Sequence, residues 1–445
     1  MNSSWRYYWE SLRTSYWFLP AVLGFSAIFA SLVTVEVDHF LHEHTSWQVN
    51  WRYTGGPEGA RAVLATIAGS MITVAGVVFS ITIVALSLAS AQFGPRLLRN
   101  FIRDRRNQFV LGTFTATFLY CLLVLRTVRG IDNEQFVPGV SVTFGILLAI
   151  TNLGVLIYFI HHVAVSIQAT SVVQAVTDEL HDAIDRLWPK NSDQDVMGSD
   201  ETPPVFPVDD AVQVLAAKSG YVDAINDEAL VLAKDRDLVI RLARRPGHFV
   251  IKGTQLAMAW PRERVDEEAT KRLNNAIVFA SQRTPFQDVE FAIDQLVEIA
   301  VRALSPGVND PFTALNCIDR LGEALSQLAQ RPVPSSLRFD DEQRLRVITY
   351  PADFRAIAAA AFNQIRQFGE GSVAVLIRML DTLAEIASLA NREADRDALV
   401  EHATLVHRAA HRSLKEEADL KDVDAQFQIA QRQLAASNAQ LKKQD

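Results

Sequence analysis

Long apolar runs dominate the first third of the chain, and four of them reach the roughly 20 residues that cross a bilayer. They lie at about residues 17–37, 62–91, 109–128 and 140–165. Lipid offers the backbone no hydrogen-bond partner, so each run is predicted to be a helix. We therefore expect a transmembrane domain over residues 1–165. Its first run is read as a retained helix, because no Ala-x-Ala-like cleavage site follows it.

The rest of the chain alternates apolar and polar positions in shorter elements. A period near 3.6 predicts a helical extension over residues 166–189, and a Ser/Asp/Pro-rich stretch predicts a linker over 190–209. Short β-type runs separated by glycine turns predict a small β-rich module over 210–260, and helical patterns predict a helical domain over 261–445. The expected fold class is mainly α: a four-helix transmembrane region followed by a cytoplasmic α+β region.

The β-rich module resembles a small barrel-sandwich of the lipoyl-carrier type in the spacing of Gly220, Gly247 and Gly253. Carriers of this type present a modified lysine on a hairpin, and Lys234 lies near that place. Its Ala-Lys-Asp context is not that of a carrier, so we interpret the module as structural or ligand-binding.

Two helix starts are predicted within the helical domain. Thr284 is expected to cap a helix with Pro285 at its first position, and Gln287 would complete a capping box. Asp310 followed by Pro311 predicts a second start of the same kind.

Charge is divided unevenly along the chain. Residues 1–163 hold 11 Arg, no Lys and 8 acidic residues, whereas the remainder holds 32 basic and 43 acidic residues. The segment between the second and third helices is Arg-rich, so it is predicted to lie in the cytoplasm with both termini. The expected location is the bacterial inner membrane, with the lipid bilayer as partner. A clustered basic stripe that would bind nucleic acid is absent from the sequence.

The second apolar run carries small and hydroxylic residues on one helical face. Such a face could line a water-filled path in a homo-oligomer, with valines as apolar constrictions. Small residues at this spacing are also the usual seam for close helix packing, and Gly69 and Gly76 flank the face. The candidate pore-lining residues are Thr66, Ser70, Thr73, Val77, Ser80, Val84, Ser87 and Ala91.

A helix break and a basic segment follow this face. Gly94 and Pro95 end the apolar run and are candidate hinge or gate residues. The arginines behind them would either ring the inner mouth of a pore or contact anionic lipid. They are Arg96, Arg99, Arg103, Arg105 and Arg106.

Two further clusters contain residue types that could bind ions. Three acidic residues recur one helical turn apart and repel each other, namely Glu290, Asp294 and Glu298. They form either a structural ion-pair face, since Arg283 and Arg302 are nearby, or an acidic vestibule for cations. On the external side, His39, His42 and Glu43 share a helical face and are a candidate divalent-metal site. A solvated interfacial segment is the alternative for these three.

Several motifs together resemble one family. They are Gly69-Ser70-Met71, Phe79-Ser80-Ile81, Ala91-Gln92-Phe93-Gly94-Pro95-Arg96, Gln282-Arg283-Thr284-Pro285, Asp288-Val289-Glu290-Phe291, and Ala303-Leu304-Ser305-Pro306-Gly307-Val308-Asn309-Asp310-Pro311. The chain is similar in these motifs to a family of bacterial predicted membrane proteins, the domain of unknown function 2254. The resemblance implies a bacterial plasma-membrane protein and adds no catalytic residue.

The sequence contains no phosphate loop, no dinucleotide turn and no zinc-ligand spacing of the common kinds, so we expect neither an enzyme nor a cofactor. The favoured hypothesis is a homo-oligomeric channel for ions, in which the second helix lines the path. The alternative is a membrane-anchored sensor or scaffold whose cytoplasmic region binds a ligand or partner. A secondary transporter is disfavoured, because the spans lack an intramembrane carboxylate.

Overall fold

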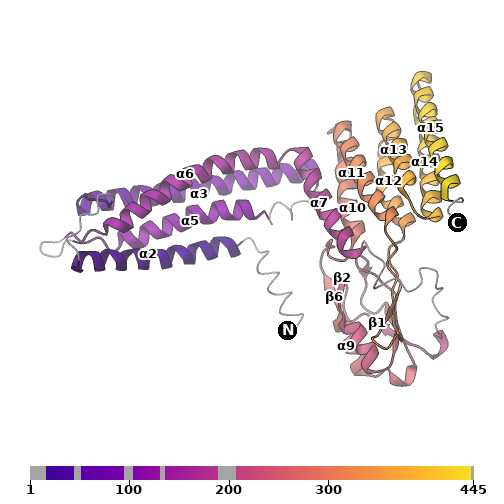
Figure 1. Cartoon of the computed structure of the whole chain (residues 1–445), viewed down its shortest axis with the longest axis horizontal. Coiled ribbons are helices and arrows are strands. Elements are labelled where there is room, and N and C mark those ends of the chain that lie inside the picture. Colours follow the sequence, from indigo (N-terminus) through magenta and orange to yellow (C-terminus); the bar gives the residue numbers. More distant parts are fainter. Residues whose placement is uncertain (1–16, 45–51, 95–103, 131–135, 189–206, 442–445) are drawn as a thin grey trace. The chain divides into compact units, whose positions relative to one another are not determined.

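The computed structural model describes residues 17–44, 52–94, 104–130, 136–188 and 207–441 (Figure 1). The chain divides into two compact units, Met1–Ser171 and Val172–Asp445. The first holds the long apolar helices, and the second holds two sheets and a series of shorter helices. The expected fold class is confirmed: four apolar helices precede a region with sheets and a helical C-terminal part.

Four long helices make up the first unit: α2 (Phe18–His44), α3 (Pro57–Phe93), α5 (Arg105–Leu125) and α6 (Gly139–Ser166). All four are long and apolar enough to cross a membrane, as predicted. Helix α5 packs against the other three and is the most buried of them. The unit is therefore arranged around α5.

Small residues and buried hydrogen bonds join these helices. A Cβ on Gly112 would lie 2.7 Å from the Cδ1 atom of Leu23, so glycine lets α5 approach α2 closely. On α6, the Asn152 side-chain amide donates a 2.6 Å hydrogen bond to the hydroxyl of Thr117 on α5, and Asn152 is buried. Such buried polar pairs hold helices together where lipid offers no competing partner.

Several helix boundaries differ from the expected ones, and α3 starts at Pro57 instead of near residue 62. Helix α2 continues to His44, although the first span was predicted to end near residue 37. The predicted helical extension over residues 166–189 is present as a separate helix, α7 (Ala169–Leu187), because a break at Ile167 and Gln168 divides it from α6. There the Ser166 hydroxyl donates to the carbonyl of Val163, and such a bond competes with the helical ladder.

The second unit contains two sheets. The five-stranded sheet has the order β1 (Val212–Leu215), β5 (Gln255–Trp260), β3 (Val239–Leu242), β8 (Leu345–Ile348) and β7 (Leu337–Phe339). Its pairs are antiparallel except for β3 with β8, which run parallel with Ile240 opposite Val347. The other sheet has the order β4 (Phe249–Val250), β2 (Gly220–Ile225) and β6 (Ile277–Ala280). Leu232, Leu238, Ile240, Leu242 and Leu256 lie in the shared core.

The β-rich region is larger than predicted and is not of the lipoyl-carrier type. Strands β6, β7 and β8 come from the range expected to be helical. All three are short, and β6 and β8 pair with strands far away in the sequence, whereas β7 pairs with β8 next to it. Residues around Lys234 form helix α8 (Glu228–Asp235) instead of a hairpin. Ala229, Leu232 and Ala233 bury one face of that helix, which is the spacing of a helix and not of a strand.

The remaining helices are α9 (Glu267–Ala276), α10 (Val289–Ala303), α11 (Pro311–Gln330), α12 (Phe354–Phe368), α13 (Val373–Leu389), α14 (Glu393–Ser413) and α15 (Glu417–Leu441). From α10 to α15 they pack as neighbouring, roughly parallel rods (Figure 1). The predicted start of α11 is confirmed, since Asp310 accepts a hydrogen bond from the Thr313 amide. The predicted cap at Thr284 is wrong: α10 starts later, and Asp288 caps it by accepting from the Phe291 amide.

Candidate functional site

The hydroxylic face of α3 points away from the rest of its own unit. All eight residues of the face are exposed, and the large ones among them, Val77 and Val84, are 52% and 67% exposed. A Cβ on Gly69 or Gly76 would meet no atom within 4 Å, so neither glycine serves close packing inside the described chain. We call the set Thr66, Ser70, Thr73, Val77, Ser80, Val84, Ser87 and Ala91 the outer stripe.

The opposite face of α3 makes the packing contacts. It is built largely from alanine, and its buried residues are Ala60, Leu64, Ala68, Ala75, Val78, Ala85, Ala89 and Phe93. These residues join clusters with side chains of α5 and α6, among them Tyr120 and Phe159. A packing seam within the chain is therefore present on α3, but the alanine face provides it and the outer stripe does not.

Hydroxyls of the outer stripe bond to their own helix. Thr66, Thr73 and Ser80 each donate to the carbonyl four residues earlier, at 2.7, 2.8 and 2.9 Å. A hydroxyl bonded in this way still has oxygen lone pairs that can accept from water or interact with a passing cation. These hydroxyls therefore have a hydrogen-bond acceptor even without water, and they can also line a water-filled path.

At its C-terminal end, α3 stops where the sequence predicts a break. Phe93 is the last helical residue, and Gly94 has φ of 114°, a conformation that favours glycine. Arg105 and Arg106 are exposed in the first turn of α5. The other predicted hinge and basic residues, Pro95, Arg96, Arg99 and Arg103, lie outside the described residues.

At the other end of the unit, a buried carboxylate holds the start of α6. Asp38, on α2, accepts from the backbone amides of Val140 and Ser141 at 2.8 and 2.9 Å and from the Ser141 hydroxyl at 2.7 Å. A carboxylate at a helix N-terminus complements the positive end of the helix dipole. The first span was predicted to end near residue 37, just before Asp38, and the longer α2 brings Asp38 to this structural role.

The predicted external metal residues lie on the last turns of α2. The rings of His39 and His42 both contact Phe136, His39 by stacking at 4.1 Å and His42 edge-on at 5.9 Å. The side chain of Glu43 lies outside the described residues. A metal site formed by the three remains a prediction.

The acidic row on α10 is half-buried and paired with arginines. Arg245 donates to Glu290 at 2.7 Å, and Arg283 donates to Asp294 at 2.7 Å. These two cations offset the like-charge repulsion that the sequence implied. A cation-attracting vestibule at Glu290, Asp294 and Glu298 stays a prediction.

Arg283 also pairs with Asp288, the capping residue of α10, at 2.8 Å. Burial raises the pKa of Asp288 to about 6, and the pairing with Arg283 acts in the opposite direction. Sequence reasoning missed Asp288. Its signal was available, because an Asp immediately before a long apolar helical period is a common cap, and Val289 begins that period.

A cavity of about 700 Å³ lies in the second unit beside these ion pairs. Its wall includes the aromatic side chains of Trp188 and Tyr350 and the charged side chains of Arg244, Arg245 and Asp288. Cavities that mix apolar walls with a few charged groups are typical of small-molecule sites. The sequence had indicated a structural or ligand-binding role for the neighbouring β-rich module.

Comparison with known proteins identifies relatives over most of the chain. A family model described as predicted membrane protein (DUF2254) matches residues 13–385. Uncharacterized proteins of Mycobacterium bovis and of Mycobacterium tuberculosis are each 36% identical over 374 residues, which cover 82% of this chain and 71% of those proteins. No solved structure matches the chain significantly.

Proposed function

The chain belongs to the DUF2254 family of predicted membrane proteins, and we propose that it assembles with copies of itself into an ion-conducting pore. In this assembly the outer stripe of α3 faces a common axis, and the alanine face of α3 packs inside each copy. The second unit assembles and gates the pore. The proposal assigns transport to the protein and no catalysis.

The observation that carries the proposal is the direction of the outer stripe. A helix face that meets only lipid is normally apolar, because the hydrocarbon chains offer polar side chains no hydrogen-bond partner. The outer stripe of α3 is hydroxylic and is flanked by large exposed aliphatic residues, such as Ile72 and Ile83. A stripe bounded in this way fits an axial path whose edges are sealed by neighbouring copies.

The length of α3 supports the same role. Its 37 residues extend about 55 Å, well beyond a hydrocarbon core of about 30 Å. The stripe therefore covers the whole thickness of a bilayer, with the exposed Val77 and Val84 about two turns apart. Rings of these valines would be apolar constrictions between rings of hydroxyls, an arrangement that gates by dewetting.

The proposed orientation places both termini in the cytoplasm of a bacterial cell. Arg105 and Arg106 at the start of α5 belong to the Arg-rich segment that follows α3. Arginines close to the ends of spans are retained on the cytoplasmic side. In this orientation Asp38 and the start of α6 lie on the external side of the inner membrane.

The test is single-channel recording from the purified chain in planar bilayers. The wild type is expected to conduct ions, and Ser80→Leu is expected to reduce the unitary current by about half or more, because leucine narrows and dries the path. Phe79→Trp adds bulk to an exposed α3 position that lies farther round the helix from the outer stripe, beyond the flanking Ile83, and is the control.

Equal currents from Ser80→Leu and wild type would contradict the role of the stripe. The absence of current in the wild type, together with a monomeric mass in detergent, would contradict the pore itself.

A second candidate function is a membrane-anchored sensor, and the cavity of about 700 Å³ favours it. The sensor needs neither a current nor a ring of copies. Ligand binding at Arg244 and Arg245 by a monomer or dimer that carries no current would support the sensor over the pore.

A further inference from the structure

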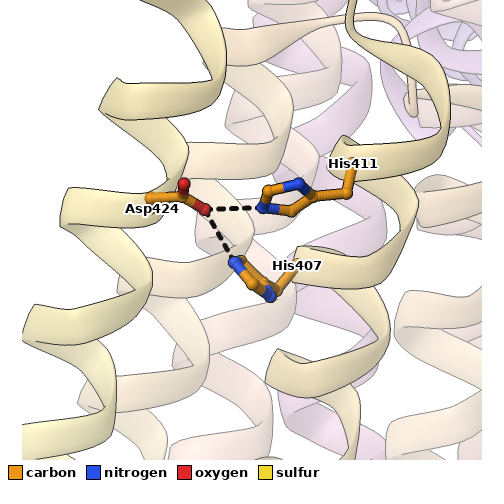
Figure 2. A group of neighbouring side chains, drawn as sticks. All are labelled: His407, His411 and Asp424. Carbon is orange, nitrogen blue, oxygen red and sulfur yellow. Dashed lines mark hydrogen bonds and ion pairs between the residues drawn. The ribbon is translucent and has the colours of Figure 1, made fainter. Parts of the chain in front are cut away.

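Three metal-ligating side chains converge on the last two helices. His407 and His411 lie one turn apart on α14, and Asp424 faces them from α15 (Figure 2). The Nε2 atoms of the two histidines lie 2.7 and 2.8 Å from the same Oδ1 atom of Asp424. All three possible ligand atoms lie within 4.8 Å of one another.

Packing fixes the orientation of this group. The ring of Phe427, one turn after Asp424, stacks on the ring of His407 at 4.1 Å and 11°. The two imidazoles lie edge to face at 4.6 Å. Val406, Ala410 and Val423 are buried next to the group and hold α14 against α15. The rotamers that bring the ring nitrogens to Asp424 are thus held by neighbours.

Solvent reaches the group from one side. The side chains of His407, His411 and Asp424 are 27%, 47% and 39% exposed. An ion can therefore enter without unfolding the helices, and a water molecule has room to complete a coordination shell.

The donor set matches the preferences of one class of cation. Two imidazole nitrogens and one carboxylate oxygen are typical zinc ligands, with a water in the fourth tetrahedral position. Ligands about 2.0 Å from a tetrahedral zinc lie about 3.3 Å from each other. Opening the present nitrogen–oxygen distances of 2.7 and 2.8 Å by about half an ångström needs only small rotations of the side chains.

We propose that His407, His411 and Asp424 bind one zinc-type divalent cation. Each neutral histidine loses the hydrogen bond from Nε2 to Asp424 and shifts its ring proton through water to Nδ1, which frees the Nε2 lone pair for the cation, while the carboxylate gives Oδ1. The bound ion joins α14 to α15 across the short connection at residues 414–416. It thereby ties the last helix to the helical part of the second unit.

This site is independent of the proposed pore and lies beyond the family match, which ends at residue 385. The expectation that the sequence lacks a common zinc-ligand spacing overlooked His407 and His411, whose i, i+4 spacing places two imidazoles on one helical face. The third ligand could not be assigned from the sequence, because it comes from the next helix.

The experiment titrates the full-length, tag-free chain in detergent with Zn²⁺ against a chromophoric chelator. One zinc per chain is expected to bind at the site. His407→Gln with His411→Gln, and separately Asp424→Asn, are expected to weaken its binding by at least about 10-fold, because each removes a direct ligand. Asp422→Asn removes an exposed carboxylate from the same helix and is the control whose affinity stays at the wild-type value.

Cobalt gives a second measurement that does not depend on any variant. Co²⁺ in the wild-type chain is expected to give the visible absorption of a tetrahedral nitrogen–oxygen site, and Zn²⁺ should remove that absorption. Zinc affinity that is equal in the wild type and the double histidine variant would overturn the proposal. So would the absence of a tetrahedral cobalt spectrum in the wild type, which would leave the three residues as a plain hydrogen-bonded group.

Discussion

Gly247 shows how one backbone position shapes the ion pairs beside the cavity. Its φ is 91°, a value that L-residues rarely adopt, and a Cβ there would lie 2.2 Å from the Oδ2 atom of Asp288. The missing side chain lets the turn before β4 approach the carboxylate that caps α10. Asp288 in turn holds Arg283 at 2.8 Å.

Replacement of Gly247 by alanine is expected to destabilise the chain. The positive φ alone costs about 1–2 kcal/mol, and the displaced carboxylate of Asp288 adds to this, for a total of at least about 2 kcal/mol. Gly253→Ala is the matched control, because Gly253 has φ of 84° and no atom within 4 Å of its Cβ position. Thermal unfolding in detergent should rank Gly247→Ala below Gly253→Ala, and an equal loss would show that the contact with Asp288 is not important.

Single residues were the hardest feature to predict from the sequence. Thr284 followed by Pro285 matched a helix start, but the Thr284 hydroxyl pairs with Asp223 at 2.5 Å, and that partner lies on a strand distant in the sequence. The row of acids on α10 implied nearby cations, and Arg283 was identified from its position. Arg245 was not identified, because it lies 45 residues before Glu290 in the sequence and no local pattern indicates the pair.

Asp38 links two helices of the membrane unit. It accepts three hydrogen bonds at the start of α6, from the amides of Val140 and Ser141 and from the Ser141 hydroxyl. It is 6% exposed, so water cannot replace it freely. The position of α2 along α6 therefore depends on one carboxylate.

Removal of this cap should loosen the contact between the two helices. Asp38→Ala is expected to cost about 1–2 kcal/mol, the usual loss when an N-cap acceptor is removed. Asp38→Asn keeps one acceptor and should lose about half as much. The thermal midpoint of the full chain in detergent measures both, and no loss in Asp38→Ala would contradict the capping role.

Whole elements could be predicted where the bilayer alone determines the structure, because a long apolar segment in lipid must form a helix. The four spans follow from apolar length alone, and the structure places a helix over each of them. Elements that depend on distant partners were not predictable. Strands β7 and β8 are only 3 and 4 residues long, and β8 pairs with β3, which lies about 100 residues earlier in the chain. The segment that forms helix α8 was placed in the β-rich module, near the hairpin of a carrier, because four apolar residues in a row fit both periods.

The two faces of α3 connect the single chain with its proposed assembly. The sequence left open whether the small residues of the second helix pack or line a path. The structure assigns the alanine face to packing within the unit and leaves the outer stripe exposed. In the proposed assembly the outer stripe meets other copies of the chain, and a single sequence does not show that contact.

The most direct measurement is disulfide cross-linking of single cysteines on α3 in native membranes. The natural Cys121 and Cys317 are buried and free, so they give little background. Val84→Cys lies on the outer stripe, and Phe79→Cys is also exposed but lies farther round α3, beyond the flanking Ile83. A common axis lined by the outer stripe predicts that mild oxidation links Val84→Cys into dimers and leaves Phe79→Cys monomeric. Cross-linking of Phe79→Cys with none at Val84→Cys would contradict it.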